Sequence, residues 1–582
     1  MRKTKIICTL GPATDSEDIL RQLLKSGMNV ARLNFSHDTH ESHLKRAERF
    51  RKIRDELKMP AALLMDTMGP KIRLTTFENS KVEIKKGEIF TLTTDNRAEH
   101  AMMASVSYED FHKDASKGDR ILIDDGLIEL IIRQIKGRNI ECEVLNGGPL
   151  STRKGVNVPG VSIKLPFISE KDKNDLKFAV DHEFDFVAAS FVRSANDVKE
   201  LRKVLEEYNG TDIKIFAKIE NREGFNNIDD IVRVSDGVMV ARGDMGVEIP
   251  FEELPHIQKE IIYRCYIAGK PVITATQLLD SMIRNPRPTR AEITDIANAI
   301  YDGTSALMLS GETSVGKYPV EAVATMAKIA VETEKNIDYI SRFQITHETA
   351  TRNVTNAISH ATCTTAHLLG AAAIISITKS GSSAKLVSKY RPACPIIAPT
   401  ISDKVYQQLS VSWGVYPVHT EPRTSTDDML NLAVERALET KLVKNGDLVV
   451  IAAGLAASIS GTTNLMKIHV IGDVLLEGRG HNELSAVGNL CVINEEHHSL
   501  EDFTEGDILV IDKTRQEILS VIKNANALVT EEEGEDSHAV IVARALDIPV
   551  ITDALNATEI LKSGTIATVD AKTGRIYSGV KK

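Results

Sequence analysis

The chain contains 582 residues, of which 42% are hydrophobic and 26% are charged, and its formal net charge is −10. That length is too great for a single hydrophobic core and predicts three or four domains. The negative charge is spread thinly without a basic block, which argues against nucleic acid and membrane surfaces as partners. Six scattered cysteines without metal-ligand spacing, no apolar segment of membrane length and no signal-peptide core predict a cytoplasmic protein.

Strand-length apolar runs alternate with helical patterns from the start of the chain. The runs Thr4–Thr9, Met28–Leu33 and Ala61–Asp66 predict three strands, and the residues between them have helical spacing. Residues 70–165 instead carry short β-like runs punctuated by Gly and Asp. This change of pattern predicts a small all-β domain inserted as a unit.

The alternation resumes after the insertion with five more runs: Phe184–Phe191, Ile213–Ile219, Gly237–Ala241, Pro271–Ala275 and Ser305–Leu309. Three strands before the insertion and five after it make eight βα units, the number that closes a TIM barrel. We therefore predict an α/β fold with a (β/α)8 barrel over residues 1–69 and 166–341. Active sites of such barrels form at the carboxyl ends of the strands.

Two further units follow the predicted barrel. Residues 342–472 contain a helical pattern at Asn353–Leu369 and apolar strands such as Ala372–Ile377 and Leu448–Ala453, which predict an α/β sandwich domain with an open sheet. Residues 473–582 have their own pattern, with strand-like runs at Gly506–Ile511, Ala525–Thr530 and Ile548–Ile551 and a helical one at Ser537–Arg544. Their number is that of a common domain, so we predict an additional α/β domain.

Charged residues end two neighbouring predicted strands. Lys218 and Glu220 are two apart, so their side chains point to the same side of a strand and can share one site. Asp244 follows the next strand between Gly243 and Gly246, where a ligand can approach the backbone. Taken singly, such pairs are typical of exposed ion pairs and turns. Two carboxylates and an ammonium at adjacent strand ends instead indicate a divalent cation that holds a phosphorylated or carboxylated small molecule.

Other predicted strands also end in polar residues. Arg32 can fork onto a phosphate group. Oxygens suited to a monovalent cation or a hydrated ion belong to Asn34, Ser36, Asp66 and Thr67. For Glu312 two roles are open, one as a ligand and one in fixing the barrel or starting a helix.

Four strand-end segments occur in one order along the chain: Ala31-Arg32-Leu33-Asn34-Phe35-Ser36-His37, Lys218-Ile219-Glu220-Asn221, Ala241-Arg242-Gly243-Asp244-Met245-Gly246 and Thr274-Ala275-Thr276-Gln277. Together they resemble the barrel motifs of the pyruvate kinases, and the resemblance covers about Met1 to Gly472. It implies a glycolytic phosphotransferase that moves phosphate from phosphoenolpyruvate to ADP and gives pyruvate and ATP.

The resemblance also implies roles for the matching residues. Glu220 and Asp244 would bind Mg²⁺, with Mn²⁺ as a substitute, and Lys218 would neutralise the phosphoryl group in flight. Arg32 would hold the phosphate before transfer, while Gly243, Asp244 and Thr276 would cradle the substrate carboxylate. Thr276 or an organised water near it would supply the proton that converts enolpyruvate to the ketone. The nucleotide-binding residues implied are Asn34, His37, Arg73 and Lys154.

One position departs from the family pattern. The usual Asp-Thr-Lys-Gly-Pro-Glu-Ile-Arg reads Asp66-Thr67-Met68-Gly69-Pro70-Lys71-Ile72-Arg73 here. Family members that need K⁺ carry the glutamate, and a branch independent of K⁺ carries lysine. We therefore hypothesise that the Lys71 ammonium reaches the pocket of Asn34, Ser36 and Asp66 and replaces K⁺. The alternative is a surface lysine at the hinge of the inserted domain.

A hydroxyl-rich loop precedes a predicted helix in the α/β domain: Thr378, Lys379, Ser380, Gly381, Ser382 and Ser383. Such a loop at a helix N-terminus suits a phosphate group, although a plain helix cap explains it equally well. The resemblance makes it an effector loop for a phosphorylated activator, a sugar phosphate or a nucleoside monophosphate, in an allosteric homotetramer.

The last domain resembles the mobile, swivelling phosphohistidine domain of phosphoenolpyruvate-utilising enzymes. The usual Thr-Ser-His motif reads Asp536-Ser537-His538, and Glu531 to Glu533 make its surroundings acidic, which opposes a second anion. The chain also lacks a separate nucleotide-grasping domain to use a phosphohistidine. We interpret His538 as a relic or a structural histidine.

Two other functions are open at this stage. A Mg²⁺-dependent aldolase or lyase acting on pyruvate-like acids would share Glu220 and Asp244, but would not need Arg73, Lys154 and a closing domain. A non-catalytic sensor of phosphometabolites would use residues 378–384 and the last domain, but would have no use for the charged strand ends.

Overall fold

The computed structural model describes residues 1–75, 81–95, 102–124, 126–161, 163–345, 353–454, 463–472, 474–493, 502–534 and 537–580. It divides into two compact units. Unit 1 consists of Met1–Thr351, Ser380–Arg391 and Ser402–Pro417, and unit 2 of Arg352–Lys379, Pro392–Ile401 and Val418–Lys582. Within the described ranges, no helix is both long enough and apolar enough to cross a membrane.

Unit 1 contains the predicted barrel. Its eight strands are β1 (Lys5–Thr9), β2 (Val30–Asn34), β3 (Ala62–Asp66), β13 (Phe186–Ala189), β14 (Lys214–Ile219), β15 (Gly237–Ala241), β16 (Val272–Ala275) and β17 (Ala306–Leu309). They close in the order β1-β17-β16-β15-β14-β13-β3-β2, and every neighbouring pair is parallel. All eight strands expected from the sequence are confirmed, so the fold class is a TIM barrel.

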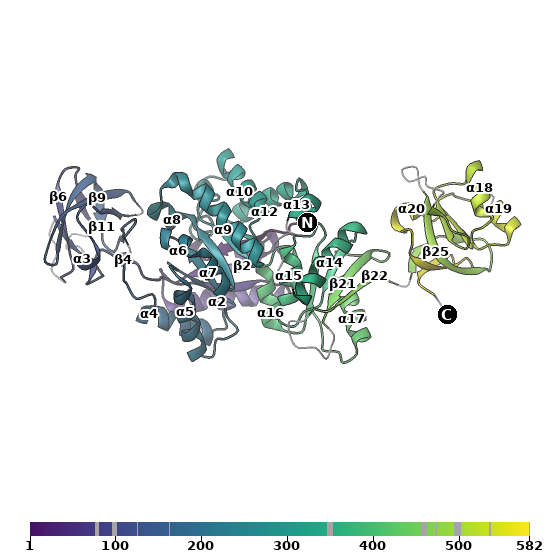
Figure 1. The fold of residues 1–582 in the computed structure, drawn as a ribbon, viewed down its shortest axis with the longest axis horizontal. Coiled ribbons are helices and arrows are strands. Elements are labelled where there is room, and N and C mark those ends of the chain that lie inside the picture. Colours follow the sequence, from purple (N-terminus) through teal and green to yellow (C-terminus); the bar gives the residue numbers. More distant parts are fainter. Residues whose placement is uncertain are drawn as a thin grey trace. The chain divides into compact units, whose positions relative to one another are not determined.

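Helices connect and surround these strands (Figure 1). They are α1 (Glu17–Ser26), α2 (His40–Glu56), α4 (Glu170–Asp181), α5 (Ala195–Glu207), α6 (Arg222–Asn226), α7 (Ile228–Val234), α8 (Arg242–Glu248), α9 (Leu254–Ala268), α10 (Arg290–Asp302), α11 (Gly311–Ser314), α12 (Pro319–Lys335) and α13 (Tyr339–Ile345). Local sequence sets their ends. In α10, Thr289 and Glu292 form a capping box at the start, and Gly303 ends the helix at a φ of 103°.

Side chains on the barrel strands alternate between two cores. On β14, Ile215, Ala217 and Ile219 point outward into the large core beneath the helices, whereas Phe216 points into the barrel interior. The interior core also receives Val30 from β2 and Leu64 from β3, among others. Because the side-chain period of a strand is two, residues two and four positions beyond these inward residues also face the barrel axis.

The inserted domain is confirmed as all-β apart from the short helix α3 (Phe111–Asp114). Its strands are β4 (Ile72–Arg73), β5 (Lys81–Ile84), β6 (Ile89–Thr93), β7 (Met103–Ser105), β8 (Arg120–Ile123), β9 (Ile128–Lys136), β10 (Asn139–Asn146), β11 (Gly148–Ser151) and β12 (Gly155–Asn157). The first strand, β4, and the last, β12, pair antiparallel, so the domain enters and leaves the barrel through one two-stranded neck. Its own core includes Phe90, Ile121 and Leu130.

Unit 1 also includes elements from later in the sequence. These are α15 (Ser382–Lys389), α16 (Asp403–Gln408) and the segment that follows α16 to Pro417. Lys5 of β1 donates a hydrogen bond to the Val415 carbonyl (2.6 Å), and Arg391 donates to the Gly303 carbonyl (2.9 Å). These segments therefore pack against the end of the barrel at which the strands begin.

Unit 2 is built around two sheets. The first sheet has the strand order β20-β19-β18-β21-β22. Its strands are β18 (Ala373–Ser376), β19 (Ile396–Thr400), β20 (Val415–His419), β21 (Leu448–Ala453) and β22 (Leu465–Val470). Two helices accompany it, α14 (Val354–Leu368) and α17 (Thr426–Glu439). The predicted strands β18, β19 and β21 are confirmed. The sequence did not predict β22, an antiparallel edge strand in which no residue is fully buried and Met466 to Ile468 are exposed.

The second sheet belongs to the last domain and has the order β23-β30-β29-β25-β26-β27-β28-β24. Its elements are β23 (Val474–Glu477), β24 (Arg479–Gly480), β25 (Ser485–Ile493), β26 (Ile508–Ile511), α18 (Leu519–Ile522), β27 (Ala527–Thr530), α19 (His538–Leu546), β28 (Val550–Thr552), α20 (Ala557–Ile560), β29 (Ile566–Asp570) and β30 (Arg575–Ser578). The predicted strands β26, β27 and β28 and the predicted helix α19 are confirmed. The division of the whole chain into four domains stays a prediction.

Candidate active site

The barrel interior becomes polar where the strands end. On β14, Lys218 and Glu220 follow the inward-facing Phe216 at intervals of two residues, so they face the barrel axis. The same alternation carries β3 from Leu64 to Asp66 and β2 from Val30 to Arg32. Strand alternation therefore gathers these side chains at the carboxyl end of the barrel, where the sequence predicted a site.

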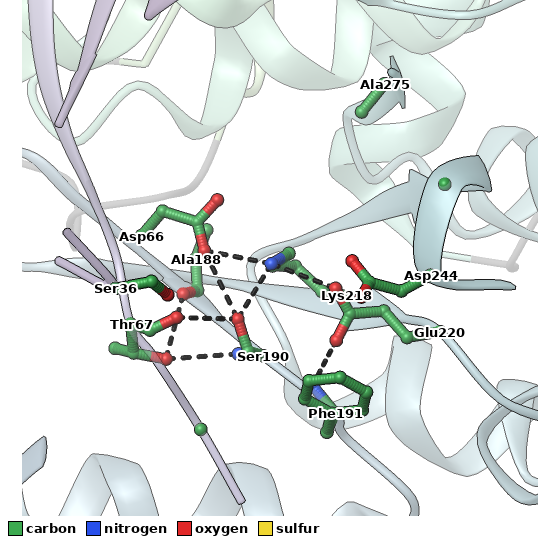
Figure 2. Close-up of polar contacts among 12 residues, drawn as sticks. Ser36, Asp66, Thr67, Ala188, Ser190, Phe191, Lys218, Glu220, Asp244 and Ala275 are labelled. Atoms are coloured by element: carbon green, nitrogen blue, oxygen red, sulfur yellow. Dashed lines mark hydrogen bonds and ion pairs between the residues drawn. The ribbon is translucent and has the colours of Figure 1, made fainter. Parts of the chain in front are cut away.

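Lys218 lies at the centre of this group, as Figure 2 shows. Its Nζ is 2.9 Å from Asp66 Oδ1 and 2.9 Å from Glu220 Oε1, and it donates to Ser190 Oγ at 2.7 Å. The Arg32 guanidinium approaches Asp66 from the other side, with Nε 2.7 Å from Oδ2. The structure thus places two cations and two carboxylates in one buried network. Arg32 comes from β2, Asp66 ends β3, and Lys218 and Glu220 come from β14 and the residue after it.

Burial and charge shift the ionisation of this network in opposite directions. Burial disfavours the charged form of Lys218, but Asp66, Glu220 and Asp244 together outweigh it and raise the pKa of the ammonium above its ordinary value. Burial likewise opposes ionisation of Asp66, but Lys218 and Arg32 lower its pKa on balance. Burial raises the pKa of Glu220 to about 7, in spite of Lys218. Lys218 therefore remains a fixed positive charge throughout the physiological range.

The remaining carboxylate, Asp244, lies beside Glu220 at the start of α8 (Figure 2). Lys71 Nζ donates to Asp244 Oδ1 at 3.1 Å. The Lys71 ammonium therefore lies at the carboxylate predicted to bind metal, rather than at the Asn34, Ser36 and Asp66 group named in the sequence-based hypothesis, because Asp66 already pairs with Arg32 and Lys218.

The donor set around Glu220 and Asp244 fits a hard divalent cation. Glu220 is fully buried, and its Oε1 has no hydrogen bond of acceptable geometry within the part of the chain that the structure describes. Its Oε2 accepts from the Phe191 backbone N–H at 2.6 Å, which fixes the carboxylate. No cluster of three or more His, Cys, Asp or Glu side chains able to hold a metal occurs among the described residues. One or two carboxylates completed by substrate oxygens and water are what Mg²⁺ takes.

The loop after β16 adjoins α8. Thr276 Oγ1 accepts from the Gly243 backbone N–H at 2.7 Å and donates to the Ala275 carbonyl at 2.6 Å. Thr276 and Gln277 have φ angles of 70° and 54°, which are uncommon for residues with a side chain and indicate a constrained turn. Thr276, Gly243 and Asp244 are therefore neighbours, as the predicted substrate-carboxylate site requires.

The residues implied for the nucleotide do not join this network. Arg73 and Lys154 lie together on the neck, where Leu74 N donates to the Lys154 carbonyl at 2.8 Å, and Lys154 Nζ pairs with Asp124 at 2.7 Å. Asn34 Oδ1 accepts from Ser36 N at 3.1 Å. The His37 carbonyl accepts from a histidine ring of α2.

A cavity of about 320 Å³ runs between the neck and the barrel. It is lined by residues of the neck region and of the loops after β13, β14 and β15, among them Lys71, Asn157, Phe191, Arg193 and Glu248. The Asn157 amide also donates to Glu248 at 2.7 Å, which links the neck to the end of α8. The cavity is large enough for part of a nucleotide next to the Asp244 carboxylate.

Of the residues proposed for a monovalent cation, Thr67 bonds to the loop after β13, where its Oγ1 accepts from Ser190 N at 3.1 Å. Figure 2 shows Ser36 and Thr67 beside Asp66. Glu312 is buried and accepts from Leu279 N and Ser310 N at 3.1 and 2.6 Å. Its carboxylate is thus used to hold backbone at the start of α11, which favours the helix-start role left open above.

Several functional side chains were missed in the sequence. Ser190 bonds Lys218, Asp66 and the Thr67 carbonyl, and Thr9 accepts from Arg32 at 2.7 Å. Arg242 Nη1 donates to both carboxylate oxygens of Asp295, at 2.8 and 2.7 Å, and Nη2 donates to the Thr276 carbonyl at 2.7 Å. Arg242 therefore helps to fix the Thr276 turn. The available signal for Arg242 was its place directly after a predicted strand, and for Ser190 it was a polar residue near the end of the predicted strand Phe184–Phe191. Thr9 ends β1 inside an otherwise apolar run and gave no such signal.

The two remote candidate sites have a clear local structure. The residues of the predicted effector loop lead into α15, whose N-cap is Gly381 at a φ of 82°, and the Ser380 and Ser382 hydroxyls bond each other at 3.0 Å. In the last domain, His538 begins α19 and its Nδ1 lies 3.1 Å from Thr514 Oγ1. Asp536 lies outside the described residues.

Comparison with known proteins agrees with this geometry. The sequence matches the family description "Pyruvate kinase, barrel domain" over residues 1–323, "Pyruvate kinase, alpha/beta domain" over 356–469 and "PEP-utilising enzyme, mobile domain" over 503–574.

Individual relatives match over the full length. A Bacillus licheniformis protein described as pyruvate kinase is 48% identical over 581 residues, covering 100% of this chain and 99% of that protein. A Geobacillus stearothermophilus protein of the same description is 47% identical, covering 99% of each. The crystal structure of a pyruvate kinase from Cryptosporidium parvum superposes with a TM-score of 0.77 at 40% identity, covering 81% of this chain and 96% of that one. The chain therefore belongs to the pyruvate kinase family.

Proposed function

We propose that the network around Lys218 carries out the family reaction, in which a phosphoryl group passes from phosphoenolpyruvate to ADP. The observation that carries the proposal is the buried Lys218 ammonium, held 2.9 Å from both Asp66 and Glu220 at the carboxyl end of the barrel. Phosphoryl transfer needs little covalent assistance and depends on fixed positive charge and on alignment of the reacting oxygens. A lysine that two buried carboxylates keep charged and immobile meets both needs.

Each neighbouring side chain then has a defined task. Arg32, anchored by Asp66 and Thr9, directs its remaining N–H groups at the phosphate of the bound substrate. The Gly243 and Asp244 backbone and Thr276 receive the substrate carboxylate. Mg²⁺ bound by Glu220 and Asp244 would offset negative charge on the phosphoryl and carboxylate oxygens. The bond from phosphorus to the enol oxygen breaks while a new bond forms to a terminal oxygen of ADP.

The enolate that remains then takes up a proton to become pyruvate. The Thr276 hydroxyl already donates its only proton to the Ala275 carbonyl at 2.6 Å. This bond favours a water molecule held at Thr276 as the proton donor, with the hydroxyl oxygen orienting that water. Arg73 and Lys154 on the neck, with Asn34 and His37, would bind the nucleotide, and movement of the inserted domain would exclude water during transfer.

The test is a lactate dehydrogenase-coupled assay with phosphoenolpyruvate, ADP and Mg²⁺. Wild-type protein should turn over, and Lys218→Met should lose roughly a thousandfold or more in kcat, since a charge present in the transition state is removed. Lys199→Met, which changes an exposed lysine of α5, is the matched control and should keep full activity. Turnover by Lys218→Met at the wild-type rate would refute the assignment. Aldol cleavage in the absence of ADP would instead indicate the alternative aldolase or lyase. A wild-type protein without activity would indicate the non-catalytic sensor.

We further propose that Lys71 makes the enzyme independent of K⁺. Its ammonium pairs with Asp244 at 3.1 Å, so it brings a permanent positive charge to the edge of the metal and carboxylate site. The ammonium can supply the positive charge that a bound K⁺ would supply, without being coordinated by the oxygens of Asn34, Ser36, Asp66 and Thr67.

The remaining assignments rest on the family resemblance. We infer a phosphorylated activator at Thr378 to Ser383, a homotetramer, and a cytoplasmic location. The division into a barrel, an inserted lid, an effector-binding domain and a mobile domain belongs to the same proposal. Saturation curves for phosphoenolpyruvate with and without sugar phosphates or nucleoside monophosphates test the activator, and light scattering tests the tetramer.

A further inference from the structure

A small basic pocket lies at the opposite end of the barrel from Lys218. It is formed within unit 1 by the turn before β16, the residue before β17, the helix α15 and the chain around Trp413. Gly269, Lys270 and Pro271 precede β16, and Ser305 precedes β17, so the pocket touches the ends at which these strands begin. Thr276 of the candidate active site and Ser310 follow the other ends of the same strands. The pocket is therefore separate from the site already described.

The lining of the pocket is strongly cationic. Lys270, Lys385, Lys389 and Arg391 all contribute side chains, and no Asp or Glu is among the lining residues. Charged groups outside the lining also act on these cations. Asp236 interacts with Lys270 and Lys385, whereas Glu334 and Arg342 interact with Arg391. Asp236 is already paired with Arg202 at 2.7 Å. Four cations thus share a space with no carboxylate of its own to balance them.

Several residues that line the pocket carry buried hydrogen-bond donors without a partner among the described residues. Arg391 is 5% exposed, and its Nη2 donates to the Gly303 carbonyl and to Ser305 Oγ at 2.9 and 3.0 Å. Its Nε and Nη1, the Tyr266 hydroxyl and the Ser412 hydroxyl are buried and have no hydrogen-bond partner among the residues that the structure describes. All four atoms can donate, and leaving such groups unsatisfied costs about 1–3 kcal/mol each. The pocket therefore favours a ligand with several hydrogen-bond-accepting oxygens.

Burial makes the excess charge costly. It lowers the pKa of Lys385 to about 8, and it also lowers the pKa values of Lys389 and Lys270. The Arg391 guanidinium stacks 4.6 Å from the centroid of the Trp413 ring, which holds it in place without neutralising it. An anion bound between these groups would relieve the repulsion among them.

The size of the pocket limits that anion. Its enclosed part has room, about 20 Å³, for the centre of a single water-sized group. A nucleoside or a sugar ring does not fit there, and a tetrahedral ion or a terminal phosphoryl group fits only if the lysine side chains move to widen the pocket. We propose that this pocket binds a doubly charged oxyanion of the phosphate class, either the free ion or the phosphoryl end of a small monoester, through Lys385, Lys389, Arg391 and the Tyr266 hydroxyl.

The test is isothermal titration of the full chain with inorganic phosphate at constant ionic strength. Wild type should show saturable binding that includes one site per chain at the pocket, besides any phosphate held in the active site or at Thr378–Ser383. Lys385→Met should weaken its affinity roughly tenfold or more, as expected for loss of a charge-assisted hydrogen bond. Tyr266→Phe removes only a hydroxyl that has no protein partner, so it should fold normally and still weaken binding severalfold. Lys199→Met, an exposed lysine of α5, should bind as wild type does.

Two further experiments distinguish the pocket from the active site and the free ion from a phosphate monoester. Lys218→Met removes the active-site cation and should retain the pocket binding, which distinguishes the pocket from phosphate bound in the active site. Competition by glycerol phosphate would identify the monoester as an accepted ligand, and lack of competition would restrict the pocket to the free ion. The proposal is overturned if no saturable binding occurs, if chloride binds as tightly as phosphate, or if Lys385→Met and Tyr266→Phe both bind as wild type does.

Discussion

At the scale of single residues, the most consequential feature is a lysine that cannot lose its charge. Lys218 is 8% exposed and Glu220 is fully buried, and neither would be tolerated alone in the barrel interior. Removing one partner of such a buried pair is typically destabilising by about 3–5 kcal/mol, because the other charge is left uncompensated. Variants at Lys218 should therefore be checked for folding by circular dichroism before their kinetics are interpreted.

Ser190 should contribute to catalysis through Lys218. The change Ser190→Ala removes the oxygen that lies 2.7 Å from Lys218 Nζ and the hydroxyl that bonds the Thr67 carbonyl at 2.7 Å. With the ammonium less firmly held, we expect kcat to fall about tenfold, in line with the roughly 1.5–3 kcal/mol of a hydrogen bond to a charged group. The KM for phosphoenolpyruvate should change little. Steady-state kinetics in the coupled assay measure both values.

The matched control for this change is Ser235→Ala. Ser235 is similarly buried, and among the described residues its hydroxyl bonds the Ile231 carbonyl of α7 alone, at 2.8 Å. It should lose a similar amount of stability while keeping wild-type kcat. If Ser190→Ala and Ser235→Ala have the same kcat, Ser190 has no positioning role.

Lys71 should decide the need for a monovalent cation. Wild-type turnover in tetramethylammonium chloride should not rise when KCl is added, because the Lys71 ammonium already lies 3.1 Å from Asp244. Lys71→Glu reverses this charge and should be nearly inactive without K⁺ and recover at least about tenfold with it, since roughly 1.4 kcal/mol corresponds to one factor of ten. The measurement is kcat against KCl concentration at fixed ionic strength. A large K⁺ activation of wild type would disprove the hypothesis.

At the scale of elements, the alternation of strand side chains determines the active site. Each of β2, β3 and β14 carries apolar inward residues first and polar inward residues last, so the same strand builds both the barrel core and the site. This regularity is why the barrel, and the placing of Lys218 and Glu220 at one strand end, could be predicted from the sequence pattern. The role of Thr276 came from the family resemblance, and the functional roles of all these residues stay predictions.

The parts that could not be predicted depend on contacts between distant elements. Lys71 pairs with Asp244, and Asp66 pairs with Arg32 and Lys218, and no local pattern reveals which of these distant charges meet. The strand β22 has partly exposed side chains and therefore no clear hydrophobic alternation in its sequence. The strand β25 pairs antiparallel with β29, which is distant along the chain. The membership of α15 in unit 1 likewise depends on packing against the barrel rather than on its neighbours in sequence.

The first strand should confer a measurable pH dependence of stability. Lys5 of β1 is 4% exposed, and burial, reinforced by Arg2, lowers its pKa to about 7. In the unfolded chain the pKa is near 10.5, so between pH 7 and 10.5 the unfolded state binds more protons and stability rises with pH. Relative to Lys5→Met, the wild-type free energy of unfolding should therefore increase by about 2–3 kcal/mol from pH 7 to pH 9.

Trp413, the only tryptophan of the chain, is buried in unit 1 and offers a fluorescence signal for this measurement in urea. Lys45→Met on the exposed surface of α2 is the control and should show no such pH-dependent difference. A difference between wild type and Lys5→Met that stays constant from pH 7 to pH 9 would show that Lys5 remains charged in the folded state.

At the scale of the whole molecule, the reacting groups and the last domain are separate. Lys218, Glu220, Asp244 and Thr276 all belong to unit 1, whereas β23 to β30 form their own sheet and core within unit 2. A chain that ends at residue 472 should therefore retain kcat within about twofold in the coupled assay, although its stability can change. A fall of kcat by roughly a hundredfold, or about 2.7 kcal/mol, would assign the last domain a catalytic role.

The last domain itself should not carry phosphate. Glu532 accepts from Thr514 Oγ1 at 2.6 Å and from Ala539 N at 3.3 Å, so a carboxylate already occupies the N-terminus of α19 next to His538. A phosphorylated His538 would meet that anion directly. Mass spectrometry under non-acidic conditions after incubation with phosphoenolpyruvate should find His538 unmodified in wild type. Detection of a stable phosphohistidine there would contradict this interpretation.

The neck of the inserted domain has a mechanical consequence. Arg73 and Gly155 are partners in the antiparallel pairing of β4 and β12, and Lys154 is bonded through its carbonyl to Leu74. Two cations that are far apart along the chain are thereby mounted on one two-stranded neck. If both bind the nucleotide as proposed above, a movement of this neck would bring them to the nucleotide phosphates, or withdraw them, together, and would couple ADP capture to ATP release.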